Sequence, residues 1–122
     1  MSIFKSEYTY RDRCEESSKM ISRYPDKIPV LCEMNPSAAI SSGIKLKLTR
    51  MKYLVPRDLT IGQLAYVIRK RFEIPSEKAM FIMVDNKVVP PTAALISDIY
   101  ERYKDFDNFL YTEIHLENFF GA

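Results

Sequence analysis

The residues best placed to do chemistry in this sequence are a glycine near its end and the single alanine that follows it. The last four residues are Phe119, Phe120, Gly121 and Ala122. Because glycine has no Cβ, its carboxyl group can enter a narrow enzyme channel and present an unhindered acyl carbon. Gly121 is therefore a candidate for activation and transfer, with Ala122 as a removable residue. The alternative interpretation is a glycine that merely ends a strand.

A second candidate site lies in a strongly basic segment. Residues 44–72 contain eight basic residues and one acidic residue, whereas residues 98–117 contain six acidic and two basic residues. Arg50, Lys52 and Leu54 share one side of a predicted strand in the basic segment. If that strand lies at a sheet edge, its cations either guard it against aggregation or attract an extended acidic peptide that adds a strand. The residues alone leave these two interpretations equally open.

The sequence contains no arrangement typical of an enzyme. The candidate nucleophiles are Cys14 and Cys32, and the sole histidine is His115. Both cysteines fall on predicted core faces, where a buried cysteine is structural. Metal sites require several ligands at matching spacing, and the three glycines form no phosphate-binding loop. We therefore expect neither catalysis nor a metal or other cofactor.

The composition favours a single intracellular globular domain. The 122 residues are 47% hydrophobic and 28% charged, with eight tyrosines and seven phenylalanines to fill a core. Two cysteines make no disulfide framework, the N-terminus lacks an apolar signal sequence, and no apolar run reaches the ~20 residues of a membrane span. Membrane association would therefore require a surface, a partner or a covalent anchor.

Hydrophobic periodicity predicts four helices. They cover residues 3–8, 10–24, 60–72 and 93–103. The second ends before Pro25, because a residue that precedes proline is disfavoured in the helical conformation. The third is the clearest, since Thr60 and Gln63 make a capping box ahead of an apolar stripe. Thr92 is the expected N-cap of the fourth.

Four strands are predicted as well. They cover residues 27–33, 51–55, 79–84 and 109–116. The run AMFIMV at 79–84 is nearly all apolar, which predicts burial on both faces of that strand. The order of the elements is that of a β-grasp sheet, an α+β arrangement in which the first and last strands lie side by side in the centre. The strand at 51–55 is then an edge, preceded by a loop or bulge near Thr49 and Arg50.

Several blocks of the sequence resemble one known family. They are RYPDKIPV, KYLVPRDLTIGQ, VIRKRF, VVPPTAALISDIY, FLY and the final FG, in the right order and spacing from Phe4 to Gly121. On these blocks the chain is identified as a member of the autophagy-related ubiquitin-like modifiers, which include the GABA-receptor-associated proteins. The resemblance implies a ubiquitin-like β-grasp (α+β) with two additional N-terminal helices. It divides the chain into a helical extension (1–26), a ubiquitin-like unit (27–118) and a C-terminal conjugation tail (119–122).

The same resemblance implies a function. A family cysteine protease would remove Ala122, and an activating and a conjugating enzyme would then transfer Gly121 to phosphatidylethanolamine. The protein would be a cytoplasmic monomer before lipidation, would lie on autophagosome membranes after it, and would reach the lysosome or vacuole on turnover. On the membrane it would recruit cargo receptors that carry aromatic-x-x-aliphatic motifs. The alternative is an unconjugated peptide-binding adaptor in vesicle trafficking or cytoskeletal association, and neither function involves nucleic acid.

The resemblance also assigns residues to two pockets beside the edge strand. The pocket for the motif's aromatic residue matches Glu16, Met20, Pro29, Leu31, Lys52, Leu54 and Phe109. The pocket for its aliphatic residue matches Val55, Pro56, Leu59, Leu64 and Val67, with Arg71 at the rim. The strand Lys52–Leu54 would pair with the ligand backbone, while Arg50 and Lys52 would meet the acidic residues of the motif.

A few positions depart from the family pattern. The loop Asn35–Thr49 is several residues longer than is usual. Met20 stands where a β-branched residue is common, and Leu64 stands where an aromatic residue is common. The smaller Leu64 side chain should enlarge the second pocket.

Overall fold

The computed structural model describes residues 2–34 and 50–118, and this part of the chain forms one mixed sheet with helices on both faces. The helices are α1 (Ile3–Glu7), α2 (Tyr10–Arg23), α4 (Ile61–Arg71) and α5 (Ile96–Tyr103). The strands are β1 (Lys27–Met34), β2 (Arg50–Pro56), β3 (Lys78–Val84) and β4 (Leu110–Asn118). The predicted α+β β-grasp with two N-terminal helices is confirmed. Residues 35–49 and 119–122, which hold the predicted long loop and the conjugation tail, lie outside the described residues.

The sheet has the order β2-β1-β4-β3, with the first and last strands in the centre as predicted. Strand β1 pairs antiparallel with β2 and parallel with β4, and β3 pairs antiparallel with β4. The parallel ladder begins at the pair Val30 and Leu110. Pro29, which has no N–H group to donate, therefore lies just before that ladder, where a proline is tolerated. Arg50 pairs in regular register with Glu33, so the expected bulge does not include Arg50.

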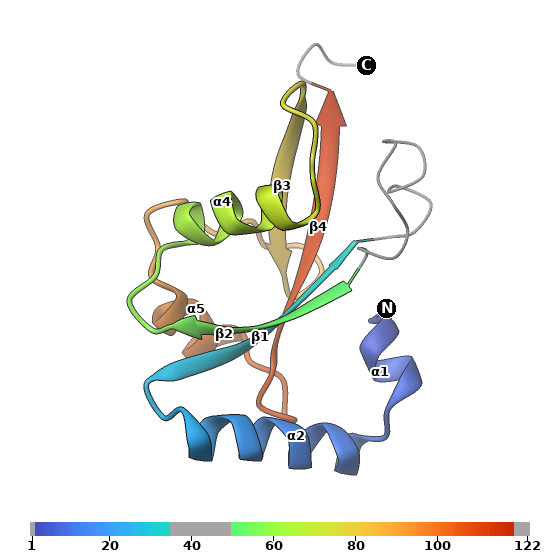
Figure 1. The fold of residues 1–122 in the computed structure, drawn as a ribbon, viewed down its shortest axis with the longest axis vertical. Helices are drawn as coiled ribbons and strands as arrows, with labels where there is room; N and C mark the ends of the chain where they lie inside the picture. The colour runs from blue at the N-terminus through green and yellow to red at the C-terminus, as the bar shows by residue number, and fades with distance from the viewer. Residues whose placement is uncertain (1, 35–49, 119–122) are drawn as a thin grey trace.

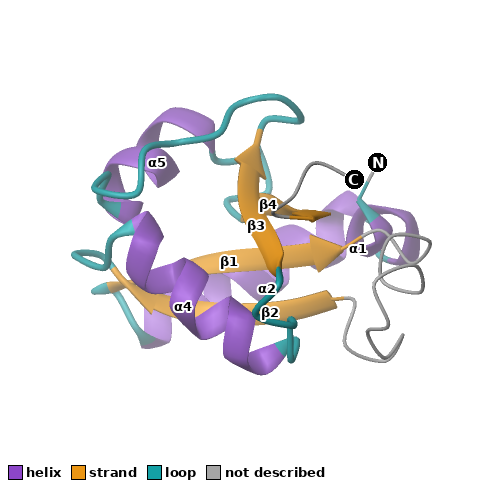
Figure 2. Cartoon of the chain, turned by 90° about the horizontal axis from the view of Figure 1, so that it is seen from above, coloured by secondary structure: helices purple, strands orange, loops and turns teal. Residues whose placement is uncertain are grey.

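Two pairs of helices cover opposite faces of this sheet (Figures 1 and 2). Helices α4 and α5 lie on the inner face, and α1 and α2 lie on the outer face. Strand β1 is buried along almost its whole length because it is covered from both sides. Ile28, Val30 and Cys32 point to the inner face, whereas Leu31 packs with Phe4 and Phe109 on the outer face.

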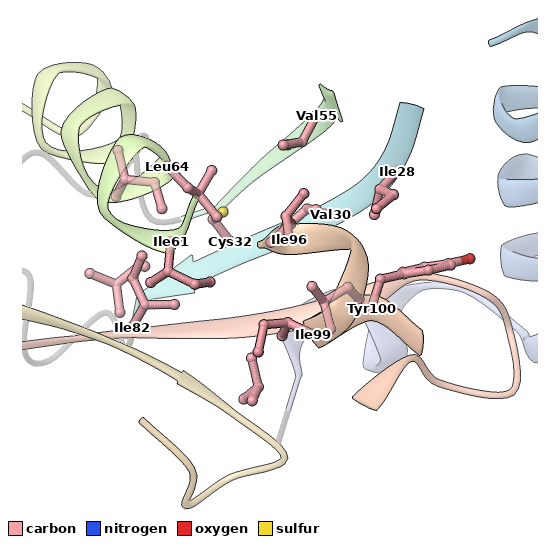
Figure 3. Packing of buried hydrophobic residues seen from close by; sticks show 14 of the residues in the cluster. Ile28, Val30, Cys32, Val55, Ile61, Leu64, Ile82, Ile96, Ile99 and Tyr100 are labelled. Carbon is pink, nitrogen blue, oxygen red and sulfur yellow. The ribbon is translucent and has the colours of Figure 1, made fainter. Parts of the chain in front are cut away.

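The larger hydrophobic core lies between the sheet and helices α4 and α5, and we call it the inner core (Figure 3). The expected apolar stripe of α4 enters it through Ile61, Leu64, Ile68 and Phe72. The capping box is present, since the Thr60 hydroxyl accepts from the Gln63 N–H at 3.1 Å and the Gln63 side chain accepts from the Thr60 N–H at 2.9 Å. Both halves of this motif satisfy amide groups that the helix itself leaves unpaired.

The prediction that β3 is buried on both faces is wrong. Ile82 and Val84 enter the inner core, but Phe81 on the other face is 38% exposed. The physical reason is position: β3 is an edge strand, and the outer-face helices pack near β1 and the start of β4 instead (Figure 1). The continuous apolar run therefore correctly predicted a strand, but it wrongly predicted that both faces of the strand are buried.

The prediction that Thr92 caps the fourth helix is also wrong. Helix α5 begins at Ile96, after Leu95, which makes no side-chain cap. The amide of Ile96 instead donates to the carbonyl of Leu59 at 2.8 Å, and the amide of Ser97 donates to that of Arg57 at 3.1 Å. Because neighbouring backbone satisfies the first amides of the helix, no capping side chain is needed.

Candidate peptide-binding edge

Strand β2 has the free edge that an added strand requires. Among the described strands it pairs with β1 alone, so its other edge faces away from the sheet. Alternation along β2 divides its side chains between the two faces. Val55 enters the inner core and Tyr53 packs against it, whereas Lys52 and Leu54 lie opposite Leu31 and Pro29 of β1. The strand therefore presents one basic and one apolar side chain toward α1 and α2.

The residues predicted for the aromatic pocket come together on the outer face. Leu31, Phe109 and Phe4 form a buried cluster, with Met20 and Tyr111 packed against it, and we call these five residues the outer cluster. The ring of Phe4 lies 5.3 Å from the ring of Phe109 in an edge-to-face arrangement. The sequence prediction missed Phe4, although the apolar pair Ile3 and Phe4 in a short, otherwise polar helix is a signal for a buried contact.

Both cations of the edge strand are paired with carboxylates of the N-terminal helices. Lys52 Nζ forms an ion pair and a hydrogen bond with Glu16 Oε1, and it lies 5.5 Å from the centre of the Phe4 ring. Arg50 Nη1 lies 2.9 Å from Glu7 Oε2, but it makes no hydrogen bond with suitable geometry, so this contact is an ion pair alone. Glu7 was not predicted. Pairs exposed to this degree each stabilise a protein by about 1 kcal/mol or less.

The residues predicted for the aliphatic pocket lie between β2 and α4. Val55 and Leu64 are buried in the inner core, with Leu59 packed against them, while Pro56 is exposed and Val67 is 38% exposed. The predicted set is thus brought together as a buried floor with exposed rim residues.

At the edge of the predicted aliphatic pocket, Arg71 makes a contact that was not predicted from the sequence. The Arg71 guanidinium lies 6.0 Å from the centre of the Tyr53 ring, which joins the last turn of α4 to β2. Burial raises the pKa of the Tyr53 hydroxyl, and the positive charge of Arg71 opposes that rise. Tyr53 therefore stays neutral in ordinary conditions and offers Arg71 an aromatic face.

Helix α2 is fixed to the start of β4 by a buried carboxylate. Asp107 is fully buried and accepts from Arg13 Nε at 2.8 Å, from the Tyr111 hydroxyl at 2.5 Å and from the Phe109 N–H at 2.9 Å. The Ser17 hydroxyl donates to the Asp107 carbonyl at 2.6 Å. Burial and the bond to Asp107 raise the pKa of Tyr111. Sequence reasoning counted Asp107 only as part of an acidic segment, because its partners are distant in the chain.

Helix α1 is held at its beginning by a second carboxylate. Glu33 of β1 accepts from the Ser2 hydroxyl at 2.6 Å and from the Phe4 N–H at 3.0 Å. Lys5 pairs with Asp105 at 2.5 Å. These contacts position Phe4 against Leu31 and Phe109, so they also determine the shape of the predicted aromatic pocket.

The residues considered for catalysis are separated. Cys32 lies in the inner core, where burial raises the pKa of its thiol to about 12, whereas His115 is exposed and lies 3.1 Å from Glu113. Cys14 is half-buried rather than in the core. Within residues 2–34 and 50–118, no group of three or more His, Cys, Asp or Glu side chains could hold a metal ion. The same ranges contain no helix that is long and apolar enough to cross a membrane.

The sequence matches a known family over most of its length. The family described as "Autophagy protein Atg8 ubiquitin like" matches residues 12–121. Autophagy-related protein 8 of Saccharomyces cerevisiae (strain YJM789) is 49% identical over 120 residues, which cover 98% of this chain and 97% of that protein.

Two solved structures have the same fold. Trypanosoma brucei ATG8 matches with a TM-score of 0.82 and 38% identity over 99% of both chains. Plasmodium falciparum Atg8 in complex with a Plasmodium falciparum Atg3 peptide matches with a TM-score of 0.79 and 28% identity, over 94% of this chain and 96% of that one. The sequence match and the shared fold lead to one conclusion: this chain belongs to the Atg8 family, the ubiquitin-like modifiers of autophagy.

Proposed function

We propose that this modifier binds short acidic aromatic-x-x-aliphatic motifs along β2 and is conjugated through Gly121 to phosphatidylethanolamine after Ala122 is removed. One observation carries the binding half of the proposal. A strand with a free edge, β2, lies between the outer cluster and the buried pair Val55 and Leu64, with Arg50 and Lys52 on it. An extended ligand needs this combination: backbone pairing for affinity and pockets on either side for specificity.

The peptide would lie as an additional strand against Lys52–Leu54. Its aromatic residue would enter the first pocket, formed by Glu16, Met20, Pro29, Leu31, Lys52, Leu54 and Phe109. Its aliphatic residue would lie on the second, formed by Val55, Pro56, Leu59, Leu64, Val67 and Arg71. Acidic residues beside the motif would pair with Arg50 and Lys52. In this proposal residues 1–26 are an extension that shapes the first pocket, 27–118 are the ubiquitin-like unit, and 119–122 are the conjugation tail.

Conjugation is proposed because the chain belongs to the Atg8 family and has Gly121 near its end. The partners would be the family cysteine protease and the activating and conjugating enzymes of the cascade. The Plasmodium falciparum relative, which shares this fold, was solved with an Atg3 peptide, and this supports a conjugating-enzyme partner here. The chain would be a substrate of the cascade rather than a catalyst, because Cys32 is enclosed in the inner core while His115, the one candidate base for it, is exposed.

The proposed cycle defines where the protein acts. The unconjugated form would be cytoplasmic, the lipidated form would lie on the autophagosome membrane, and turnover would take it to the lysosome or vacuole. Cargo receptors with aromatic-x-x-aliphatic motifs would be recruited only to membranes that carry the conjugated form.

A reconstituted lipidation reaction tests the role of Gly121. We expect the full chain to be lipidated only when the family protease is added, and a chain that lacks Ala122 to be lipidated without it. Gly121→Ala should give no lipidated product while it keeps the thermal unfolding midpoint of the original protein. Lipidation of Gly121→Ala at the normal rate would overturn the proposal.

The alternative function is an unconjugated peptide-binding adaptor in vesicle trafficking or cytoskeletal association. It requires only the free edge of β2 with the side chains beside it, and no chemistry at Gly121. Intact mass after treatment with the family protease distinguishes the two. Loss of one alanine supports conjugation, whereas an unchanged mass with intact peptide binding supports the adaptor.

A further inference from the structure

The first pocket is closed in this structure by a residue of the chain itself. Leu31 and Phe109, two of the residues proposed to receive a ligand's aromatic ring, have no exposed surface. Phe4 of α1 packs on both and is itself 2% exposed. The Phe4 ring also has Lys52 Nζ above it at 5.5 Å. A ligand ring that is to contact Leu31 and Phe109 must therefore displace Phe4.

Phe4 belongs to a short helix whose start is held by Glu33, which accepts from the Ser2 hydroxyl and the Phe4 N–H. The same helix is held by the Lys5–Asp105 pair and, just after its end, by the bond from Arg13 to the Tyr8 carbonyl. Helix α1 has five residues, and Phe4 is its one buried side chain. A helix this short is unstable without tertiary contacts. Its end nearest the edge strand is held by the exposed ion pair of Glu7 with Arg50. Figure 2 shows α1 beside the end of the sheet where β1 finishes and β2 begins.

Helix α2, in contrast, is firmly attached. It has 14 residues, and buried Arg13 and Ser17 bond to Asp107. Breaking the pair of Glu16 with Lys52 would free a cation but would leave α2 in place. The two ion pairs on the edge strand therefore have unequal consequences, since only the one made by Glu7 holds the five-residue helix that carries Phe4.

We propose that α1 is an internal substitute for the docking peptide. In it, Phe4 occupies the aromatic pocket and Glu7 forms an ion pair with Arg50. This inference rests on the proposed peptide-binding function and names a determinant of its specificity. An incoming motif replaces each of these two side chains with one of the same kind. Its acidic residue takes Arg50 from Glu7, and its aromatic ring takes the place of Phe4 on Leu31 and Phe109.

This exchange explains why acidic residues beside a motif would matter. A motif without them would have to displace Phe4 while α1 remains paired with Arg50. A motif with them would weaken that attachment as it binds. Only the free molecules in which Phe4 has left the pocket can bind the peptide. The observed affinity is therefore reduced by the fraction of such molecules, and any change that loosens α1 raises the affinity.

The test uses the full chain and two synthetic peptides, Asp-Asp-Asp-Phe-Ala-Ala-Leu and the same peptide with alanine in place of each aspartate. Glu7→Gln should bind the acidic peptide about two- to fivefold more tightly, which is the range expected when one exposed ion pair stops competing. Glu15→Gln removes the same charge from an exposed position on α2 and should leave the affinity unchanged. Phe4→Ala, if it stays folded, should bind both peptides at least about threefold more tightly.

A second readout follows α1 directly by NMR. In the free protein the Phe4 ring is 5.3 Å from the Phe109 ring, so its proton shifts report whether Phe4 lies on Phe109. The amide of Tyr8 donates to the carbonyl of Phe4 at 3.1 Å and reports the helix. The acidic peptide should remove the ring-induced shifts of Phe4 and accelerate solvent exchange at Tyr8.

The outcomes separate this inference from the function on which it rests. If neither peptide binds the original protein or any variant, the proposed function fails. If the peptides bind but Glu7→Gln has unchanged affinity and the Phe4 signals do not move, the function stands and the inference is overturned. Weaker binding by a folded Phe4→Ala would show that Phe4 is a wall of the pocket rather than its occupant, and would also overturn it.

Discussion

Asp107→Asn should lower the free energy of unfolding by about 3 kcal/mol. The carboxylate is fully buried, and the Arg13 side chain that it neutralises is 11% exposed. Asparagine can still accept from the Phe109 N–H, but its amide nitrogen would face the donors of Arg13 and Tyr111. Removing one partner of a buried ion pair costs about 3–5 kcal/mol. The remaining bond from Arg13 Nη1 to the Tyr8 carbonyl, at 2.7 Å, places the effect at the low end.

Equilibrium unfolding in urea, followed by circular dichroism, measures this effect. For a chain of 122 residues, a loss of about 3 kcal/mol corresponds to a fall in the thermal midpoint of roughly 10 °C. The urea m-value should be unchanged, since the native fold remains. Asp85→Asn is the matched control, because Asp85 is exposed with φ of 52°, a conformation that asparagine tolerates. A loss below about 1 kcal/mol for Asp107→Asn would refute the role assigned to the buried carboxylate.

Three further predictions follow from the site and its supports. Lys52→Glu should weaken binding of the acidic peptide by about 1 kcal/mol or more, with a smaller difference at high salt, and equal affinities would contradict the role of charge. Thr60→Ala should destabilise the fold by about 1 kcal/mol in urea titrations, whereas an unchanged midpoint would mean that the capping box is dispensable. Burial acts to raise the pKa of Asp105, but the hydrogen bonds from Lys5 and the Asp107 N–H, together with the charges of Lys5 and Arg13, outweigh burial and lower that pKa. Its contribution to stability should therefore be full above the ordinary aspartate range and disappear as pH falls through that range to the lowered value. Lys5→Met should remove this part of the acid dependence, and an identical pH profile would exclude it.

The parts of the fold that depend on neighbouring residues could be predicted from the sequence. Thr60 and Gln63 are three residues apart, so their capping box was visible in the sequence and is present in the structure. The alternation of β1 likewise separated Val30 from Leu31 correctly. Such features need no knowledge of what lies across the sheet.

The features that were missed depend on distant partners. The start of α5 is decided by the carbonyls of Leu59 and Arg57, which a search for a capping residue near Thr92 could not reveal. The exposure of Phe81 follows from the position of β3 at an edge. Glu7 pairs with Arg50 across a long interval of sequence, and no local pattern marks it. The side chains assigned to the two pockets do lie near one another, whereas the contacts that Phe4 and Glu7 make with them were not predicted.

The central position of β4 has a consequence for the order in which the molecule is built. Residues 110–118 are the last described strand, yet they complete two ladders at once, the parallel one with β1 and the antiparallel one with β3. Contacts between segments so far apart in the chain form slowly, because a long loop must close before they are made. On the ribosome, neither ladder can exist until these residues have emerged. A nascent chain would expose apolar surface of β1 and β3 until that moment, and such exposed surface is prone to aggregation.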